Sequence, residues 1–334
     1  MKRKTVIKRI VIAVPALLVI WMLCSICINR ITAARIPHHF ASAEEGRTLM
    51  LANTGYYGSY TQPDIEYRMQ KSGASMEELL EASAQSVQEF SFIERCFLDG
   101  RIARMYRTLK KNGYVLPPVD EITFIKTDMA LESGATGYTH GTEIYLNGTV
   151  VSLNAYMGFL PGFGQFLDEV LWHELFHCLT RCNPDFRSQM YALIHFTVAD
   201  QDFALPPSVK EKLLHNPDVE HHDAYAEFTV GGQKQECFPA WIAEKPYSEA
   251  ETGMFDGASV VLIPIDGTDT YYQQEQASDF YEVFGRNTDY VIDPEECMAD
   301  NFSYAMLYGM KGRDYMNPEI IEGIIDYVSQ EKGG

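Results

Sequence analysis

One stretch of the chain decides how the rest is interpreted, and it reads Val170-Leu171-Trp172-His173-Glu174-Leu175-Phe176-His177. It lies in a pattern that predicts a helix from about 165 to 181, ending before Asn183-Pro184. His173 and His177 are four residues apart, so a helix places both imidazoles on one face. Apolar side chains cover most of the remaining circumference, which predicts that this helix is buried.

Three ionisable side chains on a buried helix need partners, and a bound metal ion is the most economical one. The pattern H-E-x-x-H allows both histidines to hold the same ion. Neutral imidazole suits Zn²⁺, which in catalytic sites has three protein ligands and one open position. Glu174 stands beside the ligands and can take a proton from water at the metal. We therefore expect Zn²⁺ as cofactor, His173 and His177 as ligands, and Glu174 as catalytic base.

A third ligand must come from another segment, and a second helix is predicted over 295–310 after Asp293-Pro294. It contains Glu296-Cys297-Met298-Ala299-Asp300. In these two motifs the chain resembles the gluzincin metallopeptidases, the thermolysin-like zincins, in which a second helix carries E-x-x-[SA]-D. The resemblance implies that Glu296 is the third zinc ligand and that Asp300 holds the first histidine, His173. The spacing agrees, because residues four apart share one helix face and a metal-bound histidine usually donates its other N–H to a carboxylate.

Glu295 is the alternative third ligand. It lies five residues before Asp300 and therefore points away from the face that Glu296 and Asp300 share. An acidic residue in the first turn of a helix is also favoured by the helix dipole alone. We therefore prefer the dipole interpretation for Glu295 and keep Glu296 as the ligand.

The predicted elements around these motifs follow no regular β-α-β alternation, which favours an α+β fold. Helices are predicted over 76–111, 165–181, 185–198, 295–310 and 318–328, and strands within 121–153 and 259–265. The resemblance implies a zincin-like metallopeptidase fold with a strand-rich substrate edge before the first motif helix. Residues 138–150 are the expected edge, where a peptide backbone is held as an added strand.

Charge divides the chain into two unequal parts. The 334 residues carry 27 Lys+Arg and 46 Asp+Glu, for a net charge of −19. Residues 1–35 hold seven of the basic residues and none of the acidic ones. The acidic remainder argues against nucleic acid as a partner, because phosphate binding needs a basic surface.

The basic end flanks an uncharged run over 10–28, about 28 Å long as a helix and close to the thickness of a bilayer core. We expect a cytoplasmic basic segment at 1–9, a transmembrane anchor at 10–28, a linker at 29–75 and an extracytoplasmic zincin-like metallopeptidase domain at 76–334. The positive-inside rule then predicts a single-pass protein of the cell membrane with its N-terminus in the cytoplasm. The alternative is a cleaved signal peptide and a secreted protein.

These features predict a membrane-anchored zinc peptidase that hydrolyses peptide or protein substrates by activating water. The transition state needs a group that stabilises the oxyanion, and Tyr290 is the first candidate, with Tyr304, Tyr308, His221 and His222 behind it. The alternative is a non-catalytic zinc-binding surface or sensor module on the same scaffold. Its metal would be closed by a fourth ligand such as Cys297 or His140, since a closed tetrahedral site is typical of structural zinc.

Overall fold

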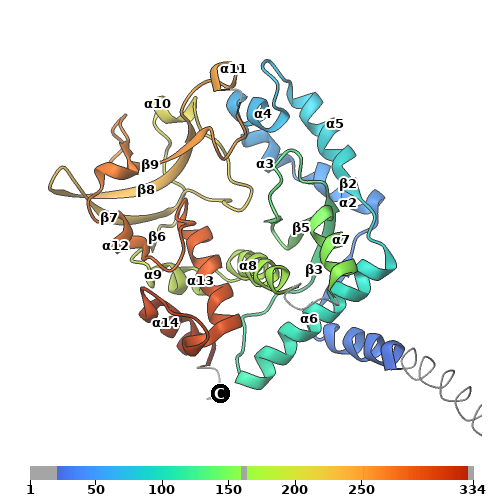
Figure 1. The fold of residues 1–334 in the computed structure, drawn as a ribbon. Coiled ribbons are helices and arrows are strands. Elements are labelled where there is room, and N and C mark those ends of the chain that lie inside the picture. The colour runs from blue at the N-terminus through green and yellow to red at the C-terminus, as the bar shows by residue number, and fades with distance from the viewer. Residues whose placement is uncertain (1–20, 159–163, 251, 330–334) are drawn as a thin grey trace, which may run out of the picture.

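The computed structural model describes residues 21–158, 164–250 and 252–329 (Figure 1). Its α-helices are α2 Ala43–Ala52, α3 Thr54–Ser59, α4 Gln62–Met69, α5 Met76–Ser86, α6 Phe92–Asn112, α7 Gly148–Met157, α8 Gln165–Cys182, α9 Pro184–Ala192, α10 Pro207–Lys210, α11 Tyr247–Ala250, α12 Phe280–Phe284, α13 Pro294–Tyr308 and α14 Pro318–Ser329. Its strands are β1 His38–Phe40, β2 Val87–Gln88, β3 Ile122–Thr127, β4 Gly137–His140, β5 Glu143–Asn147, β6 Thr197–Val198, β7 Ala224–Val230, β8 Gln233–Ala243, β9 Ala258–Pro264 and β10 Tyr272–Gln273. Short 3₁₀ helices cover Gln274–Gln276 and Gly309–Lys311, and residues 21–33 are helical.

Two sheets make up the β-structure. The first has the strand order β1-β3-β5-β4, with β2 pairing on β3. In this sheet β1, β3 and β5 are parallel, whereas β4 runs antiparallel to β5 and forms one end of the sheet. The second sheet, β10-β9-β8-β7-β6, is antiparallel throughout. The chain is therefore α+β, with one mixed and one antiparallel sheet.

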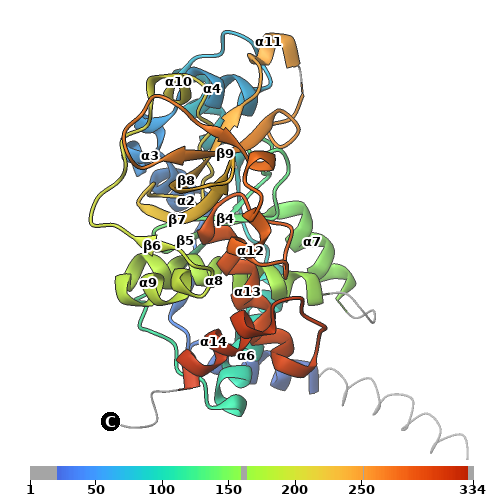
Figure 2. The ribbon, with the colours of Figure 1, turned by 90° about the vertical axis from the view of Figure 1, so that its left-hand side faces the viewer.

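Helix α8 runs through the middle of the molecule, with the first sheet on one side and α13 on the other (Figure 1). It packs directly on α13 and on β4. In the perpendicular view α8 lies beside α9, and α13 lies close to α14 (Figure 2). This placement brings one face of α8, the first turn of α13 and the end strand β4 together.

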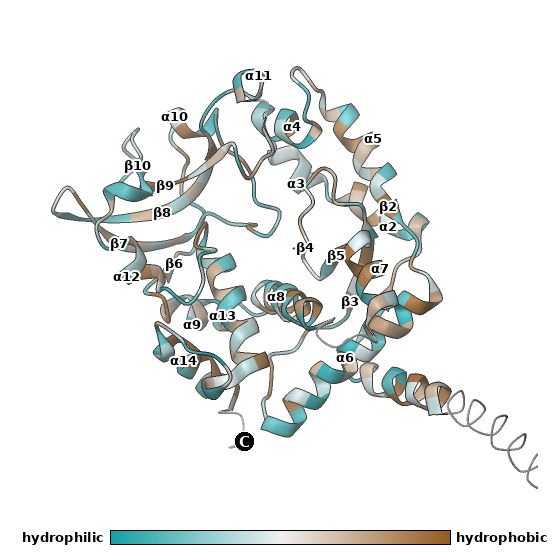
Figure 3. Ribbon diagram, viewed as in Figure 1, coloured by the Kyte–Doolittle hydropathy of each residue, from teal (hydrophilic) through white to brown (hydrophobic). Residues whose placement is uncertain are grey.

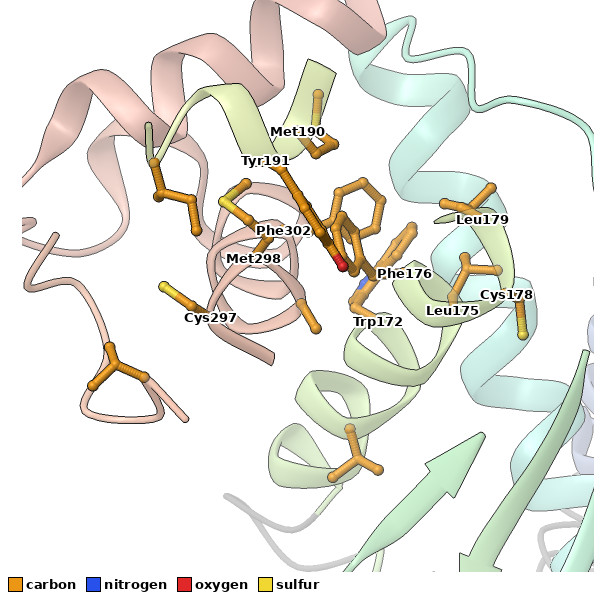
Figure 4. Packing of buried hydrophobic residues seen from close by; sticks show 14 of the residues in the cluster. Trp172, Leu175, Phe176, Cys178, Leu179, Met190, Tyr191, Cys297, Met298 and Phe302 are labelled. Atoms are coloured by element: carbon orange, nitrogen blue, oxygen red, sulfur yellow. The ribbon is translucent and has the colours of Figure 1, made fainter. Parts of the chain in front are cut away.

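The core explains why α8 is fixed in place. Trp172, Phe176 and Leu179 of α8 are at most 1% exposed. Trp172 and Phe176 pack among residues of α9 and α13, including Tyr191 and Phe302, as Figure 4 shows. Burying one such side chain contributes about 1.5–3 kcal/mol to the stability of the fold. The packing of the apolar faces therefore fixes where the polar faces of α8 and α13 lie relative to each other. Figure 3 shows hydrophobic and hydrophilic residues together on α8.

The helices predicted around the two motifs are confirmed with small shifts at their ends. The helix predicted over 165–181 is α8, and the one over 295–310 is α13. The expected helix over 76–111 is interrupted, because residues 87–88 pair with β3 as the short strand β2. Two helices, α5 and α6, flank it, and each begins with a capping box at a serine, Ser75 and Ser91.

The fold prediction is wrong in its membrane-spanning part. Among the residues that the structure describes, no helix is long and apolar enough to cross a membrane. Residues 10–20 of the expected span lie outside the described part. From Trp21 the chain is helical as far as Ala33, which is fully buried. Asn29, one residue past the expected span, accepts a hydrogen bond from Arg107 of α6 at 3.2 Å, so this end of the helix packs on the domain.

Two further expectations need correction. The range 29–75, predicted as a linker, is folded: β1 joins the first sheet, and α2 and α4 contribute Met50 and Ile65 to a second core. Capping boxes at Ser42 and Thr61 are the sequence signal that marks these helices.

The expected edge over 138–150 is only partly an edge. Strand β4 ends the sheet, but β5 lies between β3 and β4, and α7 begins at Gly148.

Candidate metal centre

The first turn of α13 faces the histidines of α8. Asp293 caps α13 by accepting the Glu295 N–H at 2.8 Å, and Pro294 occupies the first helical position. This cap fixes the directions of Glu295 and Glu296. Both side chains are more than nine-tenths buried, and both reach histidines of α8.

The structure brings together the three residues predicted as metal ligands. Glu296 Oε2 lies 3.0 Å from His173 Nε2 and 3.7 Å from His177 Nε2. One potential ligand atom from each of the three residues lies within 4.8 Å of the others. Two imidazole nitrogens and one carboxylate oxygen are a donor set that is known from catalytic zinc sites.

The histidine His177 provides the test of whether a metal fits. Its side chain is fully buried, and its Nε2 is a buried polar atom without a hydrogen bond in the described structure. Its Nδ1 is engaged by Glu295 at 2.8 Å. A buried polar atom without a partner costs about 1–3 kcal/mol. A metal ion between His177, His173 and Glu296 removes that cost, so the residues fit Zn²⁺.

Each histidine has a carboxylate on its other ring nitrogen. Asp300 Oδ1 lies 2.9 Å from His173 Nδ1, as the resemblance implied, and Thr288 donates to the second oxygen of Asp300. Burial alone would lower the pKa of His173, but hydrogen bonds with Asp300 and Glu296 raise it well above its ordinary value. Such outer partners fix which ring nitrogen is free for a metal.

The dipole interpretation of Glu295 does not describe its main contacts. Besides His177, Glu295 accepts hydrogen bonds from Thr180 at 2.6 Å and from Tyr191. Burial would raise the pKa of Glu295, but the His177 hydrogen bond is the first of several contacts that lower it. Glu295 is therefore the partner of His177, as Asp300 is the partner of His173. Only the crossing of α8 and α13 reveals this, because no spacing rule links positions 177 and 295.

The second oxygen of Glu296 is also held. Asn216 Nδ2 donates to Glu296 Oε1 at 2.5 Å, and the Tyr290 hydroxyl donates to the same atom at 3.0 Å. Burial would raise the pKa of Glu296, but the hydrogen bond with His173 leads the contacts that lower it to about 2. Tyr290, the predicted oxyanion stabiliser, thus lies beside the carboxylate predicted as the third metal ligand. Its ring stacks on His173 with centroids 6.2 Å apart.

Glu174 points from α8 toward β4. The Thr139 hydroxyl donates to its Oε2 at 2.8 Å. Its Oε1 lies so close to Gly137 that a Cβ added there would stand 2.6 Å from it. Burial raises the pKa of Glu174. Glu174, His173 and Glu296 line a cavity of about 320 Å³, so the predicted base and two of the predicted ligands face a common space.

Asp218 is a further acidic residue at this site that neither motif predicts. It lines the same cavity, and its Oδ1 lies 3.8 Å from His177 Nε2. Burial, together with Glu174 and Glu296, raises the pKa of Asp218 well above its ordinary value. It stands on a connection between α10 and β7, where no motif marks it. The nearest signal is the turn-forming Asn216-Pro217-Asp218.

The other candidates lie elsewhere. Cys297 donates to the Phe284 carbonyl, and His140 packs on Tyr56 with ring centroids 4.0 Å apart, so neither closes the metal centre. The possible metal group at His221 uses Asp223, which already pairs with Arg187. Tyr304 lines the cavity, whereas Tyr308 donates to Glu169.

Comparison with known proteins adds no further assignment. No protein-family model, no curated protein and no solved structure matches the chain. The resemblance to gluzincins therefore depends on the two helical motifs and on the contacts between them.

Proposed function

We propose that the chain is a zinc-dependent peptidase in which His173, His177 and Glu296 hold the metal. The observation that carries the proposal is the buried His177 Nε2, which has no hydrogen bond among the described residues and lies within 3.8 Å of two carboxylates at a site lined by His173 and Glu174. A purely structural cluster of histidines and acids would satisfy this atom with a hydrogen bond. Zinc bound there supplies a Lewis acid that polarises the scissile carbonyl and makes water more acidic.

Three residues of the chain then supply proton transfer, positioning of the base and stabilisation of the oxyanion. Glu174 accepts a proton as the water oxygen bonds to the carbonyl carbon, and it passes that proton to the amine when the C–N bond breaks. Thr139 holds one oxygen of Glu174 in place through its hydroxyl. Tyr290 stands at the cavity wall, and its hydroxyl can donate to a developing oxyanion when it exchanges its hydrogen bond with Glu296 Oε1 for one with that oxygen.

The cavity also favours the peptidase over the non-catalytic module. A structural zinc site needs a fourth protein ligand. Cys297 and His140, the two residues expected for that position, are engaged elsewhere. Asp218 is a further carboxyl group near that position, 3.8 Å from His177 Nε2, but its Oδ1 already accepts the Thr139 N–H at 2.6 Å. The space of about 320 Å³ beside Glu174 is instead available to a substrate.

The test uses the full-length protein loaded with zinc and a library of short synthetic peptides, with products identified by mass spectrometry. We expect hydrolysis by the wild type. Glu174→Gln should keep zinc and lose at least about 100-fold in rate, because it removes the general base. Glu77→Gln is the control, since it removes an exposed carboxylate of α5 that does not line this cavity. A Glu174→Gln protein that cleaves peptides like the wild type would contradict the proposal.

A further inference from the structure

The outer edge of β4 is the edge that faces away from β5. It is uncovered at Gly137, and residues 218–220 cover it at Thr139 and Gly141. Alternate residues of β4 point their backbone groups away from β5. Thr136 accepts the Asn147 N–H within the sheet, so Gly137 and Thr139 face outward. The Thr139 N–H donates to Asp218 Oδ1 at 2.6 Å, and the Gly141 N–H donates to Glu220 at 2.9 Å.

The segment 218–220 that covers Thr139 is held in place by Arg181. Arg181 donates to the carbonyl oxygens of Thr139 and Asp218 at 3.2 and 2.8 Å and pairs with Glu220 at 2.7 Å. Among the described residues, by contrast, no side chain bonds to the backbone of Gly137. A peptide that adds to β4 as an extra strand can therefore pair at Gly137 but must end before Thr139.

The wall at which the peptide must end is acidic. Asp218 is 6% exposed, and in the described part of the chain no hydrogen bond or ion pair reaches its Oδ2. The cavity that Asp218 lines has four further carboxyl side chains and neither lysine nor arginine among its described lining residues. Like charges repel strongly where water is excluded, so this wall rejects a terminal carboxylate and attracts an ammonium group.

We propose that the site takes peptides by their free amino end, that Asp218 binds the terminal ammonium group, and that the protein is an exopeptidase releasing residues from the amino terminus. This inference rests on the proposed peptidase function and narrows its substrates. The first residue of the peptide occupies the cavity, with its ammonium against Asp218. The following backbone passes Gly137 and leaves on the open side of Glu174.

The first experiment compares the peptide library with free amino termini against the same library acetylated at the amino terminus. Product analysis should show single amino-terminal residues released from free peptides. Acetylation removes the ammonium charge from a buried pair and should slow cleavage by about 30-fold or more. Asp218→Asn should reduce that preference to a few-fold, whereas the control Glu77→Gln, at an exposed carboxylate of α5 outside this cavity, should keep it. Thermal melting checks that both variants fold, and the comparison on the wild type stands even if Asp218→Asn does not.

A second experiment measures binding rather than activity. Zinc-loaded Glu174→Gln protein is titrated calorimetrically with one free peptide and with its acetylated form, and the free form should bind about 30-fold more tightly. Equal binding of the two forms would overturn the inference. Equal cleavage of acetylated peptides at internal bonds would also overturn it while leaving the peptidase function intact. Faster internal cleavage by Asp218→Asn would likewise overturn it, because residues 216–220 would then act as an inhibitory strap. A zinc-loaded wild type that cleaves neither library would contradict the proposed function itself, and the binding comparison would still decide how peptide ends are recognised.

Discussion

Replacing Gly137 by alanine should displace the Glu174 carboxylate and leave zinc binding unchanged. The substitution therefore tests the role of Glu174 separately from that of the metal. The added Cβ would stand 2.6 Å from Glu174 Oε1 and 3.2 Å from the Tyr145 carbonyl oxygen, whereas ordinary contacts begin at 3.4 Å. The carboxylate therefore has to retreat by about 0.8 Å, the difference between 3.4 and 2.6 Å. No atom of His173 or His177, the proposed metal ligands, is among the three atoms nearest to that Cβ.

The two consequences differ in size. Overpacking of this kind costs about 1–3 kcal/mol of stability, part of which the lower chain entropy of alanine offsets. A displacement of about 1 Å in a catalytic group can cost about 100-fold in rate. We expect Gly137→Ala to fold, to bind zinc like the wild type and to hydrolyse peptides about 100-fold more slowly.

The assay combines thermal melting, zinc content and peptide hydrolysis on the same preparation. Gly55→Ala is the control, because a Cβ at Gly55 of α3 meets nothing within 4 Å, and it should leave the rate unchanged. If Gly137→Ala keeps zinc and also keeps the wild-type rate, Glu174 is not the base positioned against β4.

Three further predictions concern the partners of the site and a buried histidine. Glu295→Gln and Asp300→Asn should each weaken zinc binding by about 10- to 100-fold, measured by competition with a chelating dye, and unchanged affinity would rule out their roles as histidine partners. Tyr290→Phe should lower kcat by about 100-fold with zinc retained, and an unchanged kcat would remove Tyr290 as oxyanion stabiliser. Burial lowers the pKa of His140 from 6.5 to about 3, so the unfolded chain binds this proton first and stability falls as the pH drops below 6.5. Between pH 7.5 and 5 the wild type should therefore lose about 2 kcal/mol more than His140→Phe in urea unfolding, and equal losses would contradict a neutral buried His140.

The sequence predicts the parts of the site that depend on helix periodicity. His173 and His177 lie on one face of α8, and Glu296 and Asp300 lie on one face of α13, because residues four apart always do so. The apolar remainder of α8 predicts its burial in the same way. These are local properties of a helix, so the amino-acid sequence alone predicts them.

Contacts that depend on how helices and loops pack cannot be predicted from the spacing of residues in the sequence. Glu295 reaches His177 because α13 crosses α8 at that point, and Asp218 reaches the cavity because a connection folds back along β4. No spacing in the sequence encodes either crossing. The folded range 29–75 differs, since the capping boxes at Ser42 and Thr61 are local signals and the weak apolar periodicity around them concealed the short helices.

The most direct test of the central claim is a crystal structure of the zinc-loaded protein with an anomalous difference map at the zinc edge. We predict one peak within about 2.0–2.2 Å of His173 Nε2, His177 Nε2 and Glu296 Oε2, with its fourth position facing the cavity beside Glu174. A map without a peak between these atoms, or a peak closed by a fourth protein ligand, would contradict the account of a zinc peptidase.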